Sequence, residues 1–112
     1  MLNPDKIIID KSLVPYEFSI ELTGTRYKIR IDYNHLHDFF TATLIKGDEV
    51  LVYGEKIVYG EALFSGVFVN NGDYPAVDII PLDLSGGEDT ASWSTLGERV
   101  FLYLDNRAEA LV

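Results

Sequence analysis

The stretch that decides the fold is residues 16–33, YEFSIELTGTRYKIRIDY. Its first half alternates aromatic or aliphatic residues with charged or polar ones, and the second half does the same after the break at residues 23–25. Side chains on a strand point to opposite faces in turn, so each half has one face for burial and one for water. Two such runs around a glycine-containing turn predict a β-hairpin.

Two registers fit this hairpin. A turn at residues 24–25 puts glycine first, as type II′ turns prefer, but it sets Glu17 opposite Asp32. A turn at residues 23–24 instead pairs Glu17 with Arg30, and an opposite-charge pair across strands contributes roughly 0.2–1 kcal/mol. Both registers keep the apolar faces together. We expect the first register, because turn geometry is the more local constraint.

The rest of the chain continues in short strand-like segments separated by turns. Further strands are predicted at residues 38–46, 49–53, 56–59, 66–70, 76–84 and 99–105. Pro81 cannot donate to a strand ladder, so its strand is expected at an edge, at a bulge or at a break. The apolar segment 99–105 is expected to be a central strand. The sequence therefore predicts an all-β fold, a small antiparallel β-sandwich or barrel of about seven to nine short strands.

The chain length of 112 residues indicates a single domain. We expect residues 1–112 to form one all-β domain, with an ordered core at about 6–105 and a short C-terminal tail at 106–112. The chain has no cysteine, which excludes disulfides, thiolate metal sites and a cysteine nucleophile. The first ten residues, MLNPDKIIID, lack the basic start and long apolar segment of a signal peptide, so assembly in the cytoplasm is expected.

The net charge of −9 disfavours two classes of partner. Its field repels nucleic acid and anionic lipid over the surface as a whole. The longest apolar run, residues 100–104, is far shorter than a membrane span of about 20 residues. We therefore expect no nucleic acid and no membrane among the partners.

Both histidines of the chain, His35 and His37, lie between two predicted strands. Residues two apart on an extended segment point the same way, so the pair could reach one metal ion if a third ligand such as Asp38 joined it. The neighbouring Asn34 and Asp38 are equally ordinary turn residues. We expect a solvated hairpin loop rather than a metal site, and no cofactor.

No catalytic motif stands out. There is no GxSxG nucleophile elbow, no P-loop and no dinucleotide fingerprint, and acidic pairs are expected by chance among eighteen carboxylates. Four aromatic residues near turns are candidates for an interaction surface: Trp93, Tyr53, Tyr59 and Tyr74. Trp93 lies in the irregular stretch 85–98, where it could anchor a partner or fold back over an open end of the sandwich. The chain is therefore predicted not to be an enzyme.

The order of these segments resembles that in the plug-like baseplate proteins of contractile-tailed phages, a family described from a cyanophage baseplate. The resemblance covers roughly residues 14–105. It rests on these matching segments: residues 18–27 (FSIELTGTRY), 32–34 (DYN), 38–40 (DFF), 47–49 (GDE), 58–63 (VYGEAL) and 96–104 (LGERVFLYL). In one departure, Phe39 and Phe40 stand where members of that family often carry tryptophan.

The resemblance implies a non-enzymatic structural subunit of a phage or prophage tail baseplate, assembled at the tail tip. It further implies association with copies of itself and with other tail or baseplate proteins. The alternative from the residues alone is a small β-sandwich binding module for a carbohydrate or a partner protein, which would use Trp93 and the tyrosines near turns.

Overall fold

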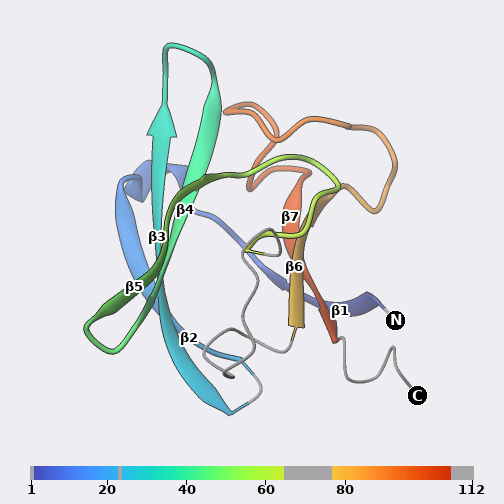
Figure 1. Ribbon diagram of the computed structural model, residues 1–112. Helices are drawn as coiled ribbons and strands as arrows, with labels where there is room; N and C mark the ends of the chain where they lie inside the picture. Colours follow the sequence, from blue (N-terminus) through green and yellow to red (C-terminus); the bar gives the residue numbers. More distant parts are fainter. Residues whose placement is uncertain (1, 23, 65–76, 107–112) are drawn as a thin grey trace.

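The computed structural model describes residues 2–22, 24–64 and 77–106. The described residues form seven strands and one short 3₁₀ helix (Figure 1). In chain order these are β1 (Leu2–Ile7), η1 (Lys11–Leu13), β2 (Tyr16–Leu22), β3 (Thr25–Asn34), β4 (Phe39–Lys46), β5 (Glu49–Lys56), β6 (Val77–Leu82) and β7 (Phe101–Asn106).

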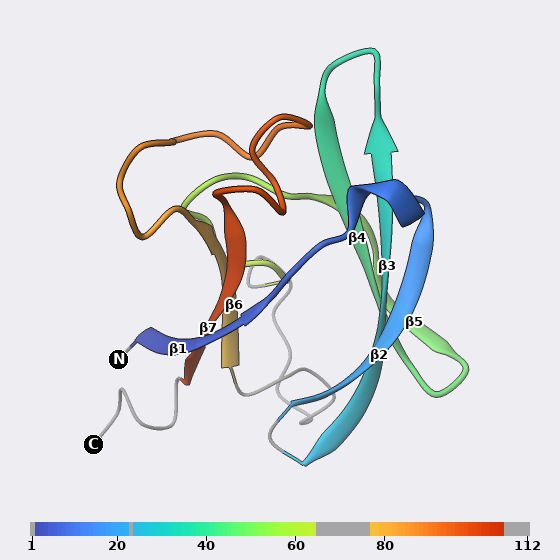
Figure 2. The same cartoon turned by 180° about the vertical axis from the view of Figure 1, so that it is seen from behind.

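The strands form two antiparallel sheets that face each other across the core. One sheet has the order β2-β3-β4-β5 and the other has the order β1-β7-β6. The views in Figures 1 and 2 place the two sheets on opposite sides of the molecule, with the chain crossing between them after β1 and after β5. In the described residues the sheets do not close into a barrel, so the sandwich form of the all-β prediction is confirmed.

The β2–β3 hairpin forms as predicted, but the expected register is wrong. Leu22 lies opposite Thr25 and Glu17 opposite Arg30, which is the register that pairs opposite charges. Gly24 takes the second turn position with φ = +84°, a left-handed conformation that glycine adopts without a Cβ penalty. This register is therefore favoured over the one with glycine first, because it pairs opposite charges across the strands and still places glycine where φ is positive.

The strands outside the hairpin follow the sequence prediction with three main differences. β5 continues to Lys56, so the separate strand expected at 56–59 is absent, and the segment expected at 66–70 lies outside the described residues. β1 was not predicted, because it contains Pro4 and no alternation, and it forms an edge of its sheet. Of the alternatives expected for Pro81, an edge strand, a bulge or a break, the structure has the edge strand, and the central position of the last strand is confirmed.

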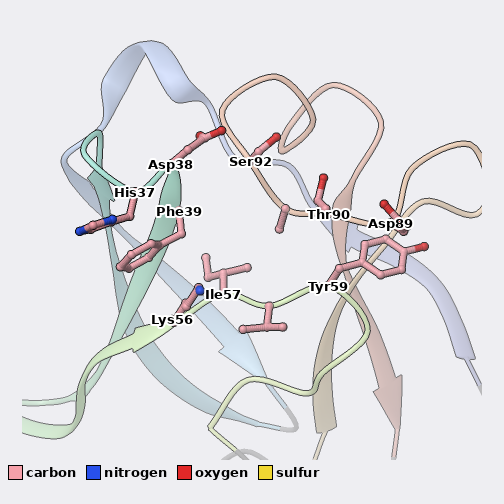
Figure 3. A pocket seen from close by; sticks show the side chains of 11 residues that line it. His37, Asp38, Phe39, Lys56, Ile57, Tyr59, Asp89, Thr90 and Ser92 are labelled. Atoms are coloured by element: carbon pink, nitrogen blue, oxygen red, sulfur yellow. The ribbon is translucent and has the colours of Figure 1, made fainter.

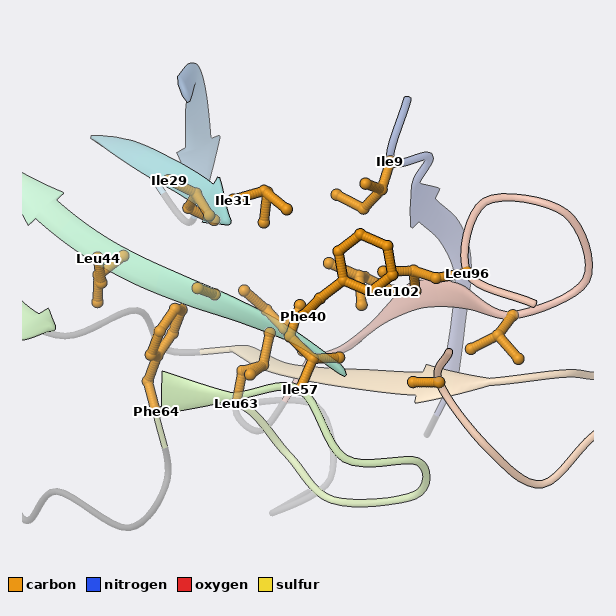
Figure 4. Packing of buried hydrophobic residues seen from close by; sticks show 14 of the residues in the cluster. Ile9, Ile29, Ile31, Phe40, Leu44, Ile57, Leu63, Phe64, Leu96 and Leu102 are labelled. Atoms are coloured by element: carbon orange, nitrogen blue, oxygen red, sulfur yellow. The ribbon is translucent and has the colours of Figure 1, made fainter. Parts of the chain in front are cut away.

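The core lies between the sheets. Each strand with alternating apolar and polar residues contributes its apolar face to this core. Inward residues of β3 and β4, including Ile29, Ile31 and Leu44, belong to one buried cluster with Leu102 of the opposite sheet (Figure 4). Ile79 of the opposite sheet belongs to the same cluster. All five are almost completely removed from solvent. Burying a side chain of this size contributes about 1.5–3 kcal/mol, so this alternation supplies much of the stability of the sandwich.

A tight turn closes the core ahead of β7. Gly97 has φ = +83° and its amide donates to the Val100 carbonyl at 2.8 Å. A Cβ at Gly97 would collide with the backbone carbonyl oxygen of Ile9. Glycine is therefore required here for two reasons: the backbone conformation and the close approach of the chain that follows β1.

Candidate interaction surface

The histidine pair lies in the β3–β4 turn, as predicted. The side-chain oxygen of Asn34 accepts hydrogen bonds from the amides of Leu36 and His37, at 3.0 and 3.2 Å. His35 and His37 are both exposed, and Leu36 between them is 79% exposed. Within the described residues, no three His, Cys, Asp or Glu side chains lie close enough together to hold a metal ion.

Asp38 connects this turn to a segment 55 residues further along the chain. One oxygen of its carboxylate accepts from the Tyr33 hydroxyl at 2.7 Å and from the Trp93 amide at 2.9 Å. The hydrogen bond from Tyr33, followed by that from the Trp93 amide, lowers the pKa of Asp38. The same hydrogen bond raises the pKa of Tyr33, because ionising the phenol would remove the donor and repel the carboxylate.

The indole of Trp93 packs over the end of the sandwich. Its ring lies parallel to that of Phe40, with an interplanar angle of 8° and centroids 5.9 Å apart, and its centroid is 4.8 Å from that of Tyr33. The ammonium of Lys11 donates to the Trp93 carbonyl and lies 5.4 Å from the ring centroid. We call Lys11, Tyr33, Asp38, Phe40 and Trp93 the Trp93 corner.

Trp93 is thus both a covering residue and an exposed one. It is 43% exposed although β3, β4 and η1 all contact it. One face of its ring is occupied by Phe40. Its fixed and half-exposed position suits an aromatic anchor in a protein–protein contact.

A pocket of about 480 Å³ opens beside the Trp93 corner (Figure 3). We call it the corner pocket, and it is lined by residues 37–39, 56–59 and 89–92. Ile57 and Ala91 are buried in its lining, whereas Lys56, Asp89 and Thr90 are exposed. The ammonium of Lys56 lies 4.7 Å from the ring centroid of Phe39. The pocket therefore combines buried apolar groups with a polar rim of both charges.

The structure brings some of the aromatic candidates together and separates others. Tyr59 lines the corner pocket, and its hydroxyl accepts from the Asp83 amide at 3.1 Å. Tyr53 is 85% exposed and lies on β5, where it does not line the pocket. Tyr74 lies outside the described residues. The four candidates therefore do not form one surface.

Asp83 is an organising residue that the sequence reading missed. It is 6% exposed, and its carboxylate accepts from the amides of Ser85, Gly87 and Glu88 at 2.9, 3.1 and 2.9 Å. The pKa of Asp83 is lowered, chiefly by the hydrogen bond from the Ser85 hydroxyl. The Asp-x-Ser spacing could have indicated this role in the sequence, since Asp side chains often accept hydrogen bonds from the backbone two residues further on.

The same Asp-x-Ser spacing occurs at the start of η1, where the carboxylate of Asp10 accepts hydrogen bonds from the amide and the hydroxyl of Ser12.

The fold and this surface define a class of protein. Two open sheets carry hydrogen-bonded loops, an anchored aromatic residue and a mixed polar pocket, and these features suit contact with other proteins. The chain matches the model of the family described as cyanophage baseplate Pam3 plug gp18 over residues 5–107, so it belongs to that family. Comparisons with curated proteins and with solved structures found no match.

Membership of this family gives the role of the chain. It is a structural component of the phage baseplate, non-enzymatic, located in the baseplate of the virion and associated with other baseplate proteins. The family match extends beyond the expected range of 14–105 at both ends. No helix among the described residues is long and apolar enough to cross a membrane.

Proposed function

We propose that the chain docks on another baseplate protein through the Trp93 corner and the corner pocket, and that it also associates with copies of itself at the tail tip. The observation that carries the docking is the position of Trp93, which is half-exposed yet held by hydrogen bonds and ring contacts from three elements. An anchor that is already fixed loses little conformational entropy on binding.

The corner pocket supports a partner of particular chemistry. Its volume of about 480 Å³ lies within the range of about 300–1,000 Å³ that is typical of binding pockets. Buried apolar groups in its lining favour an apolar side chain, and the rim residues Lys56 and Asp89 offer charges of both signs. A short extended segment of a baseplate protein, with one apolar side chain and polar flanks, fits this description. The net charge of −9 supports a protein partner over nucleic acid.

A substitution that fills the pocket tests this proposal. The tagged chain is co-expressed with proteins encoded beside it, and the captured complexes are weighed by native mass spectrometry. Thr90→Trp, at an exposed position in the pocket lining, is expected to weaken capture at least about tenfold, because truncating or blocking a central contact has effects of that size. Glu21→Trp, an equally large side chain on exposed β2, is the matched control and is expected to leave capture unchanged. Equal capture by the Thr90→Trp variant and the wild type would contradict docking at the pocket.

A further inference from the structure

The corner pocket is assembled from segments that lie far apart in the chain. Its lining at residues 37–39 reaches into β4 and its lining at 56–59 begins at the end of β5, so both parts belong to the four-stranded sheet. The third part, residues 89–92, lies between β6 and β7 of the other sheet. No strand pairing among the described residues joins 37–39 to 89–92, so other contacts set the width of the pocket between them.

The carboxylate of Asp38 spans this gap. One of its oxygens accepts a hydrogen bond at 2.9 Å from the Trp93 amide, which directly follows Ser92 of the lining. Figure 3 shows the Asp38 side chain directed across the top of the pocket toward the loop that carries Ser92. The Tyr33 hydroxyl donates to the same oxygen at 2.7 Å. Tyr33 therefore restrains the rotation of the carboxylate that holds the loop.

The loop on the far side of the pocket is held together by its own hydrogen bonds. The hydroxyl of Thr95 donates to the Thr90 carbonyl at 2.7 Å and accepts from the Ser92 amide at 2.8 Å. Thr95 itself is buried. Because residues 90–95 are bonded to one another in this way, a single attachment at the Trp93 amide sets the position of the pocket lining and of the indole together.

The backbone at Asp38 separates the role of its side chain from the role of the turn. Its φ is +54°, in the left-handed region that glycine enters freely and that few other residues adopt. The Asp38 side chain is also exposed, so it fills no part of the core. Its distinctive contribution is the acceptor oxygen for two donors. Glycine at this position would keep the backbone conformation and remove only the carboxylate.

We propose that Asp38 is the positioning residue of the docking site: by holding the Trp93 amide, it fixes the width of the corner pocket and the place of the indole beside it. This inference rests on the docking in the proposed function and adds the residue that prepares the site for a partner. A partner that meets a pocket already formed does not have to order the loop on binding, which favours tighter association.

The free protein provides the first test, because Trp93 is the single tryptophan of the chain and its fluorescence reports on the corner alone. The indole is 43% exposed, so Asp38→Gly is expected to raise its quenching by acrylamide by up to about twofold as the loop loosens. Tyr33→Phe keeps the ring contacts with Trp93 and removes only the hydroxyl, and a smaller increase is expected. Asp48→Gly, the same substitution in the exposed β4–β5 turn, is the matched control and is expected to leave quenching unchanged. Far-UV circular dichroism verifies that each variant is folded.

Capture of co-expressed baseplate proteins, weighed by native mass spectrometry, is the second test. Asp38→Gly is expected to weaken capture about two- to tenfold, because ordering one large side chain on binding costs an amount of that size. Asp38→Asn keeps an oxygen that can accept from the Trp93 amide, so it is expected to recover part of both effects. Asp48→Gly is expected to capture like the wild type.

The two tests together decide the inference. A folded Asp38→Gly variant with unchanged quenching, or with unchanged capture, would overturn it, and Tyr33→Phe decides in the same way if Asp38→Gly does not fold. Thr90→Trp, which fills the pocket, distinguishes the two levels of the proposal. If Thr90→Trp weakens capture and Asp38→Gly does not, docking at the pocket stands and the positioning role fails. If Thr90→Trp captures like the wild type, docking at the pocket fails and the inference fails with it.

Discussion

The β2–β3 hairpin and the Trp93 corner are both well defined, but contacts of different range define them. In the hairpin, residues close in sequence pair through seven consecutive register positions, and one face of each strand enters the core. In the corner, Asp38 reaches Trp93 across 55 residues and Lys11 reaches it across 82. A local pattern can therefore be read from the sequence, whereas the corner exists only because the sandwich brings distant polar groups together.

The largest expected effect separates Gly24, in the local hairpin, from Gly97, where the turn ahead of β7 meets the distant residue Ile9. Gly24 and Gly97 have nearly equal φ values of +84° and +83°, but only Gly97 lies where a Cβ would meet backbone. Gly24→Ala is expected to cost about 1–2 kcal/mol through its left-handed conformation alone. Gly97→Ala adds the collision with the Ile9 carbonyl and is expected to cost about 3 kcal/mol or more. Urea unfolding followed by far-UV circular dichroism measures both, and equal losses would show that the long-range contact at Gly97 is unimportant.

An intermediate effect is expected from acid. The pKa values of Asp38 and Asp83 are lowered in the folded protein, by hydrogen bonds led by those from the Tyr33 and Ser85 hydroxyls respectively. The unfolded chain therefore takes up protons first as the pH falls, so the stability that these carboxylates contribute is present above about pH 4 and is lost below it. Urea unfolding between pH 6 and pH 2.5 is expected to show this decline, with a shallower decline in Asp38→Asn. An unchanged pH dependence in that variant would contradict a charge-dependent corner.

The smallest effect concerns the hairpin register. Glu21 lies directly opposite Arg26 in the structure, whereas the register with glycine first would set it opposite Lys28. A double-mutant cycle with glutamine at Glu21 and Arg26 is expected to give a coupling free energy of about 0.2–1 kcal/mol. The cycle between Glu21 and Lys28 is the control and is expected to give a smaller value. A larger coupling to Lys28 would favour the other register in solution.

The error in the expected register shows where reasoning from the sequence is least secure. The alternation of residues 16–33 fixed which faces are buried, and it left the register to a choice between turn chemistry and charge pairing. The structure takes the register in which Glu17 meets Arg30 and Glu21 meets Arg26, with Gly24 still at a left-handed position. Two favourable pairs and an acceptable turn together outweigh the preferred place for glycine.

The candidate surface was predictable only in part. The position of Trp93 in an irregular stretch pointed to either a covering or an anchoring role, and the structure gives it features of both. The hydrogen bond between the Trp93 amide and the Asp38 carboxylate could not be predicted from the sequence, because no local sequence pattern links two residues in separate loops. The loop organised by Asp83 had a signal in its Asp-x-Ser spacing, which is a local motif.

The sequence by itself determined the all-β class, the buried and exposed faces of the alternating strands, the histidine turn and the central place of the last strand. It could do so because alternation and turn residues act over a few neighbouring positions. Only the tertiary structure decided the pairing of β1 with β7, the close approach at Gly97, the Trp93 corner and the separation of Tyr53 from Trp93. These depend on how two sheets face each other across a shared core, and that arrangement follows from many packing contacts that no single stretch encodes.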